Sequence, residues 1–119
     1  MIAILRDRLE RKKVTNVTPI LASQHDPRLP AGFADLVLIV NTFHHFPSGA
    51  VYLRAVETCL KPRGRVVNID FHGGDLPVGP PSGEKLSRID FLKLARAVGF
   101  SVAAEHTFLP YQYFVELKR

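Results

Sequence analysis

The sequence predicts an α/β fold in which parallel strands alternate with helices and an antiparallel pair of strands ends the chain. Two segments are typical of strands buried on both faces of a parallel sheet: residues 36–40 are five consecutive apolar residues, and residues 65–70 are a second strand-like segment. Between them, residues 48–60 have the apolar spacing of a helix. The last two apolar stretches are joined only by Pro110 and Tyr111, which favours antiparallel neighbours.

The composition is that of one globular domain covering residues 1–119. Hydrophobic residues make up 46% of the 119 residues and charged residues 23%, which excludes wholesale disorder. The formal net charge of +5 permits anionic partners without identifying one. Cys59 is the single cysteine, so an internal disulfide framework is excluded. No apolar run approaches the roughly 20 residues of a membrane helix. We expect a cytoplasmic protein, with neither a membrane nor a specific nucleic acid indicated as partner.

Residues 1–13 are predicted to form an amphipathic helix, because apolar residues recur at helical spacing among charged ones: Ile2, Leu5 and Leu9. Charges every second or third residue argue against a signal peptide. The helix begins at residue 1 without a preceding cap, so we expect that an upstream part has been removed. Residues 17–22 predict a short strand, in which Pro19 indicates a sheet edge or a strand end, and a polar loop follows over residues 23–32.

After the helix over residues 48–60, the Lys-Pro-Arg-Gly sequence at residues 61–64 predicts a turn. Residues 73–83 are rich in Gly and Pro and are expected to form a loop. Ser87 and Asp90 form a capping box for a helix that runs to about residue 98, where Gly99 ends it. Two strands complete the chain, over residues 101–109 and 112–117.

Polar residues follow three of the predicted strands, at the edge where open parallel sheets bind ligands. The three clusters contain His25 and Asp26, then Asn41, Thr42, His44 and His45, and then Asp70 and His72.

Each cluster also has a structural interpretation. Asp26 precedes a proline and is a common turn former. His44 and His45 are adjacent and cannot point the same way from a regular element, so one of them is expected to pack or cap. Asp70 could act as a general base or cap a turn, and the residues leave both open. No metal site is predicted, because the spacing of the histidines matches no known zinc motif, and no glycine-rich phosphate loop is present.

Several motifs occur in an order and spacing that belong together. They are Asp-Pro-Arg-Leu-Pro ahead of Asp35, the run Leu-Val-Leu-Ile-Val, His-His-Phe at residues 44–46, and Leu-Lys-Pro-x-Gly at residues 60–64. Ala-Val-Gly-Phe and Leu-Pro-Tyr-Gln-Tyr-Phe complete the series near the end. Together they resemble the class I S-adenosylmethionine-dependent methyltransferases of type 11/25, over essentially the whole chain. The resemblance implies a Rossmann-like sheet, here incomplete.

Two departures from the family pattern matter. Arg63 stands where the first of two glycines is usual, which is a turn variation. In the family, a glycine-rich cofactor loop, the first strand and an acidic residue that ends the second strand come before the helix with which this sequence begins. None of the three is found in this sequence. The resemblance therefore implies a truncated, carboxyl-terminal portion.

The resemblance implies S-adenosylmethionine as the cofactor, with weak or absent binding by this chain alone. By position in the family pattern, the cofactor-binding residues would be His25 and Asp26 near the adenine, Asn41 and Thr42 under the methionine and ribose portions, and Phe43 as apolar packing. The catalytic residue would be His44 or His45, which would face the methyl acceptor and take its proton. The loop over residues 72–83 would cover the acceptor pocket.

Two function classes stay open. The first is methyl transfer to an unidentified small-molecule or other acceptor, impaired or absent in this chain alone. The second is a non-catalytic interaction module or gene fragment that is stable only as an oligomer or beside a complementing chain.

The strand arrangement follows from the same pattern. We expect residues 35–40 and 65–70 to be parallel neighbours in the sheet centre, joined by a right-handed crossover. Because the missing strands would leave one ladder of residues 35–40 open, residues 17–22 are expected to fill the vacant place. In solution we expect self-association through the open edge.

Overall fold

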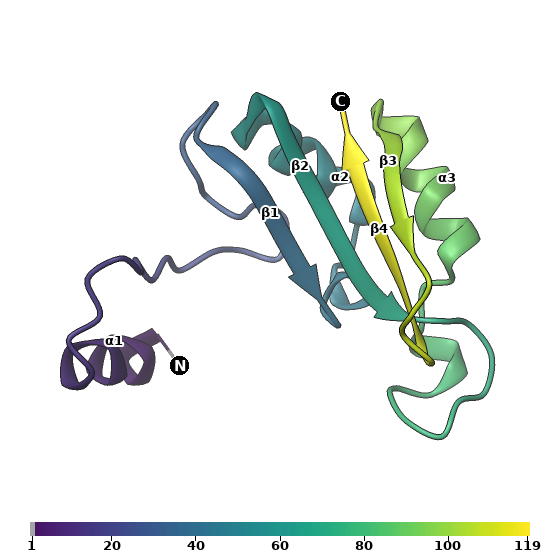
Figure 1. The fold of residues 1–119 in the computed structure, drawn as a ribbon, viewed down its shortest axis with the longest axis horizontal. Helices are drawn as coiled ribbons and strands as arrows, with labels where there is room; N and C mark the ends of the chain where they lie inside the picture. The colour runs from purple at the N-terminus through teal and green to yellow at the C-terminus, as the bar shows by residue number, and fades with distance from the viewer. Residues whose placement is uncertain (1) are drawn as a thin grey trace.

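The computed structural model describes residues 2–119. Its elements are α1 (Ile2–Arg11), β1 (Ala34–Val40), the 3-10 helix η1 (Phe43–His45), α2 (Gly49–Cys59), β2 (Leu60–Phe71), the 3-10 helix η2 (Ser82–Glu84), α3 (Arg88–Val98), β3 (Ser101–His106) and β4 (Gln112–Lys118). The four strands form one sheet in the order β1-β2-β4-β3. The pair β1 and β2 is parallel and the other two pairs are antiparallel, which confirms the predicted fold class (Figure 1).

The two predicted apolar strands are parallel neighbours, as expected. In Figure 1 both run downward, β2 lies to the right of β1, and α2 lies behind the sheet, so the crossover is right-handed. The prediction that both lie in the sheet centre is wrong for β1, which is an edge strand. The turn predicted over residues 61–64 lies within β2, where Ala34 pairs with Leu60 and Leu36 pairs with Arg65. Those four residues therefore bulge opposite Asp35 alone.

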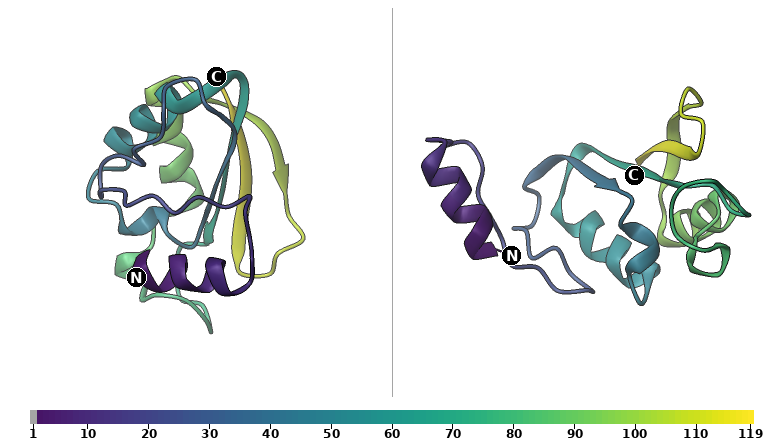
Figure 2. Two further views of the ribbon diagram at one scale, coloured as in Figure 1. Left: turned by 90° about the vertical axis from the view of Figure 1, so that its left-hand side faces the viewer. Right: turned by 90° about the horizontal axis from the view of Figure 1, so that it is seen from below.

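The hydrophobic core lies between the sheet and the two helices α2 and α3, which cover the same face of the sheet (Figure 2). Apolar side chains from both helices meet those of β2 and β4 there, among them Leu53, Val56, Phe91, Ala95, Val66, Val115 and Leu117.

The second face of β1 is uncovered, so the prediction that this strand is buried on both faces is wrong. Ile39 points toward the helices and is buried, whereas the alternate residues Leu36, Leu38 and Val40 are 56%, 59% and 43% exposed. Successive side chains of a strand point to opposite faces, and among residues 2–119 no element covers this one. We call these three residues the apolar stripe.

The strand predicted over residues 17–22 is absent. This segment is extended chain without a ladder, and Val17, Ile20 and Leu21 are exposed. Within residues 2–119, β1 pairs with β2 alone, so the expected pairing of residues 17–22 with β1 is wrong as well. Instead the linker reaches the sheet by bonding to the end of α2, where Gly32 N and Phe33 N donate to the carbonyls of residues 58 and 59.

The predicted amino-terminal helix forms but ends at Arg11, two residues before its predicted end, and its expected first residue, Met1, lies outside the described residues. None of its residues is buried. Figures 1 and 2 show α1 standing away from the sheet at the end of the extended linker. No helix in the described range is long and apolar enough to cross a membrane.

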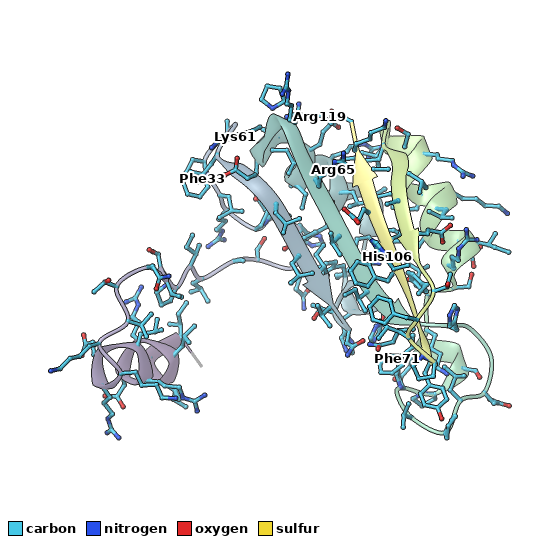
Figure 3. All side chains as sticks on the ribbon, in the orientation of Figure 1. Phe33, Lys61, Arg65, Phe71, His106 and Arg119 are labelled. Carbon is cyan, nitrogen blue, oxygen red and sulfur yellow. The ribbon has the colours of Figure 1, made fainter. Side chains whose placement is uncertain are left out.

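The remaining helices begin and end where side-chain chemistry predicts. Ser48 Oγ accepts a hydrogen bond from Val51 N, and Ser87 Oγ accepts one from Asp90 N at 3.2 Å. Gly99 ends α3 in the left-handed conformation, with a φ of 111°. The third strand is shorter than predicted and ends at His106. Figure 3 shows Lys61, Arg65 and Arg119 at the end of the sheet where β2 begins, with Phe71 toward the opposite end.

Candidate functional site

The carboxyl ends of β1 and β2 lie side by side, next to the start of β4. The chain leaves β1 through Asn41, whose φ of 53° lies in the left-handed region. Its N–H donates to Ile69 O at 2.8 Å, and its Oδ1 accepts from Gln112 Nε2 at 2.6 Å. Thr42 Oγ1 donates to Val40 O at 2.8 Å. These bonds fix the turn that leads into η1.

Phe43 anchors η1 in the core. Its ring is buried and makes edge-to-face contacts with Phe46 and Phe91, at centroid distances of 5.4 and 5.0 Å. Gly49 allows α2 to start directly against this ring, because an added Cβ would lie 2.7 Å from the Phe43 ring. The two histidines after Phe43 therefore follow a residue that is fixed by core packing.

His44 forms a buried pair with Asp70, at the carboxyl end of β2. His44 Nδ1 lies 2.9 Å from each carboxylate oxygen, and the two side chains are 4% and 1% exposed. Asp70 also accepts hydrogen bonds from His44 N at 3.2 Å and Phe71 N at 2.9 Å. Because a carboxylate only accepts, Nδ1 carries a proton, and in the neutral imidazole Nε2 then has the lone pair. The hydrogen bonds to Asp70 fix the orientation of the His44 ring.

His45 lies beside this pair and is exposed, with its ring centroid 4.1 Å from that of His44. The prediction that one of the two histidines would be packed holds for His44. Asp70 is neither a lone base nor only a cap, because it binds both the backbone of η1 and the imidazole.

A cavity of about 640 Å³ opens in front of the histidines. Its walls come from η1 and the residues after it, from the start of α2, from Leu94 of α3, and from the loop after β2: Phe43, His44, His45, Phe46, Pro47, Gly49, Gly83, Glu84, Lys85, Leu86 and Leu94. The walls combine aromatic and aliphatic side chains with polar and charged ones, and polar surface predominates. The loop that the sequence predicted over residues 73–83 lies at this cavity through Gly83.

The other predicted site residues lie on an exposed loop. Asp26 Oδ1 accepts a hydrogen bond from Arg28 N at 2.7 Å, which closes a local turn, and His25 is exposed. Burial, reinforced by the charge of Asp26, raises the pKa of Tyr52. The Tyr52 ring stacks on Phe46 at 3.7 Å. The loop thus approaches α2, although no hydrogen bond within residues 2–119 joins His25 or Asp26 to residues 41–45.

Two polar features at the site have no counterpart among the predicted residues. Tyr113 is buried and its hydroxyl donates to Leu86 O at 3.0 Å. Burial, with the charge of Asp70, raises the pKa of Tyr113. Asn68 is fully buried, and its side-chain nitrogen and oxygen have no hydrogen-bond partner among the described residues. In the sequence, both residues alternate with apolar ones and are indistinguishable from core positions. Among residues 2–119, no three His, Cys, Asp or Glu side chains gather to hold a metal ion.

A family model described as a methyltransferase domain matches residues 1–68, more than half of the chain. The chain belongs to the methyltransferase family. The class I, S-adenosylmethionine-dependent type that its motifs resemble is supported by this match and by the fold. No curated protein matches the methyltransferase sequence.

Solved structures share the fold of this methyltransferase at low sequence identity. An S-adenosylmethionine-dependent methyltransferase from Aquifex aeolicus aligns with a TM-score of 0.89 and 19% identity, over 98% of this chain and 62% of that one. One from Mesorhizobium loti gives a TM-score of 0.79 and 16% identity, over 100% and 77%.

An O-methyltransferase from neocarzinostatin biosynthesis has been solved in complex with S-adenosyl-L-homocysteine and 1,4-dihydroxy-2-naphthoic acid. It aligns with a TM-score of 0.78 and 23% identity, over 98% of this chain and 38% of that one. The methyltransferase described here thus spans less than two thirds of the length of the Aquifex structure.

Proposed function

We propose that this chain takes part in methyl transfer from S-adenosylmethionine to a small-molecule acceptor, with His44 as the general base. The observation that carries the proposal is the buried His44–Asp70 pair on the wall of the cavity. Asp70 holds the imidazole with Nδ1 protonated, so Nε2 can accept a proton. His45 is the alternative base, because it is exposed and also lines the cavity. We expect this activity in the cytoplasm, as the composition predicts.

We assign the cofactor to the rim formed by the carboxyl end of β1 and the loop before it. Bound S-adenosylmethionine supplies an electrophilic methyl group. Asn41 and Thr42 are exposed polar side chains at the rim, which fits contacts to a ribose or amino-acid portion. His25 and Asp26 are the further polar candidates, on the loop that approaches α2. Phe43 contributes by packing beneath the rim.

The chemistry of the base indicates the class of acceptor. As the acceptor oxygen takes the methyl group it loses its proton, and His44 Nε2 takes that proton. An imidazole titrates near neutral pH, so it matches a phenol-like hydroxyl, with a pKa of about 10, much better than an aliphatic alcohol. The relative from neocarzinostatin biosynthesis holds a dihydroxynaphthoic acid, which supports a phenolic acceptor.

A direct test measures transfer of tritium-labelled methyl groups from millimolar S-adenosylmethionine to 1,4-dihydroxy-2-naphthoic acid. We expect His44→Gln to lower the rate by about 100-fold or more, because general-base catalysis contributes that much. His106→Gln is the matched control, since His106 pairs with Glu116 on β4 and does not line the cavity. Equal rates in the wild type and His44→Gln would contradict the assignment of the base.

Binding of the cofactor by this chain alone is expected to be weak. The candidate cofactor groups come from only two short stretches, residues 25–26 and 41–43, and the sequence offers no glycine-rich phosphate loop. Titration calorimetry with S-adenosylmethionine should therefore give a Kd of about 1 mM or weaker, near −4 kcal/mol. A micromolar Kd, about −8 kcal/mol, would refute this expectation.

An interaction role is favoured by a separate observation, the open edge of β1. One ladder of this strand has no partner among residues 2–119, and the apolar stripe is exposed beside it. Unpaired strand edges readily pair with another chain. We infer that two copies meet at this edge in a symmetric pair that covers the stripe.

Sedimentation over micromolar concentrations tests the inferred self-association. The wild type should sediment as a dimer, and Leu38→Lys should make it a monomer because the charge lies in the middle of the stripe. Phe108→Lys introduces the same charge at an exposed aromatic residue that follows β3 and should leave the dimer intact. A folded wild-type monomer at every concentration would exclude the self-association.

A further inference from the structure

We propose that Tyr113 is a positioning residue that holds the loop between β2 and α3 closed over the acceptor cavity. The inference rests on the proposed function for the role of the cavity, but the closure itself is a property of the chain alone. We call residues 73–86 the lid. Glu84, Lys85 and Leu86 of the lid line the cavity together with His44 and His45.

Both stems of the lid are attached to the start of β4. On the first stem, His72 N donates to Tyr111 O at 2.9 Å. On the second stem, Tyr113 Oη donates to Leu86 O at 3.0 Å. The first bond is made by the backbone and survives any side-chain change. The second depends on one hydroxyl group, so a change of the Tyr113 side chain can remove it.

The lid moves as a unit because its own residues are bonded to one another. Ser82 Oγ donates to Asp75 Oδ1 at 2.6 Å, and Lys85 Nζ donates to Gly74 O at 2.6 Å. Most of its residues are nevertheless exposed, and Leu86 is the lid residue that packs, partly buried, against the hydrophobic core. A segment with these properties opens at a low free energy unless a specific contact holds it.

Tyr113 is placed to act as a fixed anchor. It pairs with Asp70 across the sheet, its ring lies 6.0 Å from that of Phe91, and it is almost fully buried. Burial and the negative charge of Asp70 raise its pKa, so its hydroxyl stays protonated and remains a donor. Phenylalanine would fill the same space without the donor. Tyrosine at this position therefore supplies the donor to Leu86 that phenylalanine lacks.

Limited trypsin digestion of the chain without ligands tests the closure. Trypsin cleaves after Lys85 and must bind the Lys85 side chain to do so. In the closed lid that side chain is hydrogen-bonded to Gly74 O, so cleavage requires the lid to open. Tyr113→Phe should raise the cleavage rate at Lys85 about tenfold, the effect of losing one hydrogen bond when opening is fast. Tyr111→Phe is the matched control, because the hydroxyl of Tyr111 makes no hydrogen bond within residues 2–119, and it should leave the rate unchanged.

Two reference sites in the same digest separate closure from general destabilisation. Arg28, on the exposed linker, reports trypsin activity, and Lys93, within α3, reports opening of the core. The proposal is supported when cleavage at Lys85 rises relative to both. A parallel rise at Lys85 and Lys93, or no rise at Lys85, would overturn it.

Methyl transfer gives an independent second readout. For 1,4-dihydroxy-2-naphthoic acid, Tyr113→Phe should raise KM about tenfold and leave kcat within about twofold, because the lid forms a binding wall and does not supply the base. A fall in kcat at unchanged KM would contradict the positioning role. The digestion requires neither cofactor nor acceptor. It therefore tests the closure of the lid even if the chain proves to have no methyl-transfer activity.

Discussion

Asp70→Ala is expected to lower the free energy of unfolding by about 3 kcal/mol. The change leaves three donors without their acceptor, namely His44 N, His44 Nδ1 and Phe71 N. They lie in a region where the imidazole is 4% exposed, so water cannot fully replace the carboxylate. Each buried donor left unsatisfied costs about 1 kcal/mol or more. Urea unfolding measures the change.

Asp70→Asn separates the effect on stability from the effect on the base. The single asparagine carbonyl can still accept from one of the two backbone N–H groups, so one backbone donor is lost and the loss of stability should stay at about 1 kcal/mol. Its amide group donates to His44 Nδ1 and thereby moves the imidazole proton to Nε2. We expect methyl transfer to fall by about 100-fold or more in this folded variant.

The tautomer itself can be observed. In the wild type, nitrogen NMR should show His44 protonated at Nδ1, and in Asp70→Asn it should show the proton at Nε2. His106, which pairs with Glu116 through Nε2, serves as an internal reference that should not change. An unchanged His44 tautomer in the folded variant would contradict the role given to Asp70.

Phe91→Ala is expected to lower the free energy of unfolding by about 3–5 kcal/mol, the usual cost of emptying a phenylalanine site in a core. The Phe91 ring is fully buried and contacts the rings of Phe43 and Tyr113, so it joins α3 to η1 and to β4. A cavity there removes packing from three elements at once. The midpoint of urea unfolding should fall without a change in the denaturant slope.

Phe108→Ala is the matched control for this prediction. The Phe108 side chain is 73% exposed, and an exposed substitution of this kind should change the free energy of unfolding by no more than about 0.5 kcal/mol. Comparable losses in Phe91→Ala and Phe108→Ala would show that the core does not have the arrangement described.

The order of elements could be predicted from local signals, and the surroundings of β1 could not. The run Leu-Val-Leu-Ile-Val favours a strand wherever it lies, but burial of its second face depends on elements that must come from elsewhere in the chain. Among residues 2–119 nothing reaches that face, so Leu36 and Leu38 are exposed.

The same reasoning explains the strand that does not form. Residues 17–22 are apolar enough for a strand, but a strand requires a partner ladder as well as a suitable composition. Pro19 removes one donor, and the linker is bonded to the end of α2 through Gly32 and Phe33. The hydrogen bonds of Gly32 and Phe33 lie outside residues 17–22, so the apolar pattern of that segment gives no sign of them.

At the candidate site, the sequence predicted which residues follow the strands but not which of them meet. His44 and Asp70 are 26 positions apart and come together because β1 and β2 are parallel neighbours of matching register. Tyr113 was hidden for another reason. Tyr113, Val115 and Leu117 occupy every second position, which is the pattern of a strand with one face in the core. A hydroxyl group does not alter that pattern.

The left-handed turn at Asn41 has a consequence for how variation among relatives should be interpreted. With a φ of 53°, this position disfavours most side chains by about 1 kcal/mol, and it tolerates glycine, asparagine and aspartate best. An evolutionary record restricted to these three residues would therefore reflect backbone geometry first. Substitution by glycine permits the same backbone conformation but removes the carboxamide, and with it the hydrogen bond from Gln112 Nε2 as well as any contact to a ligand. Invariance at this position alone is not evidence of a ligand contact.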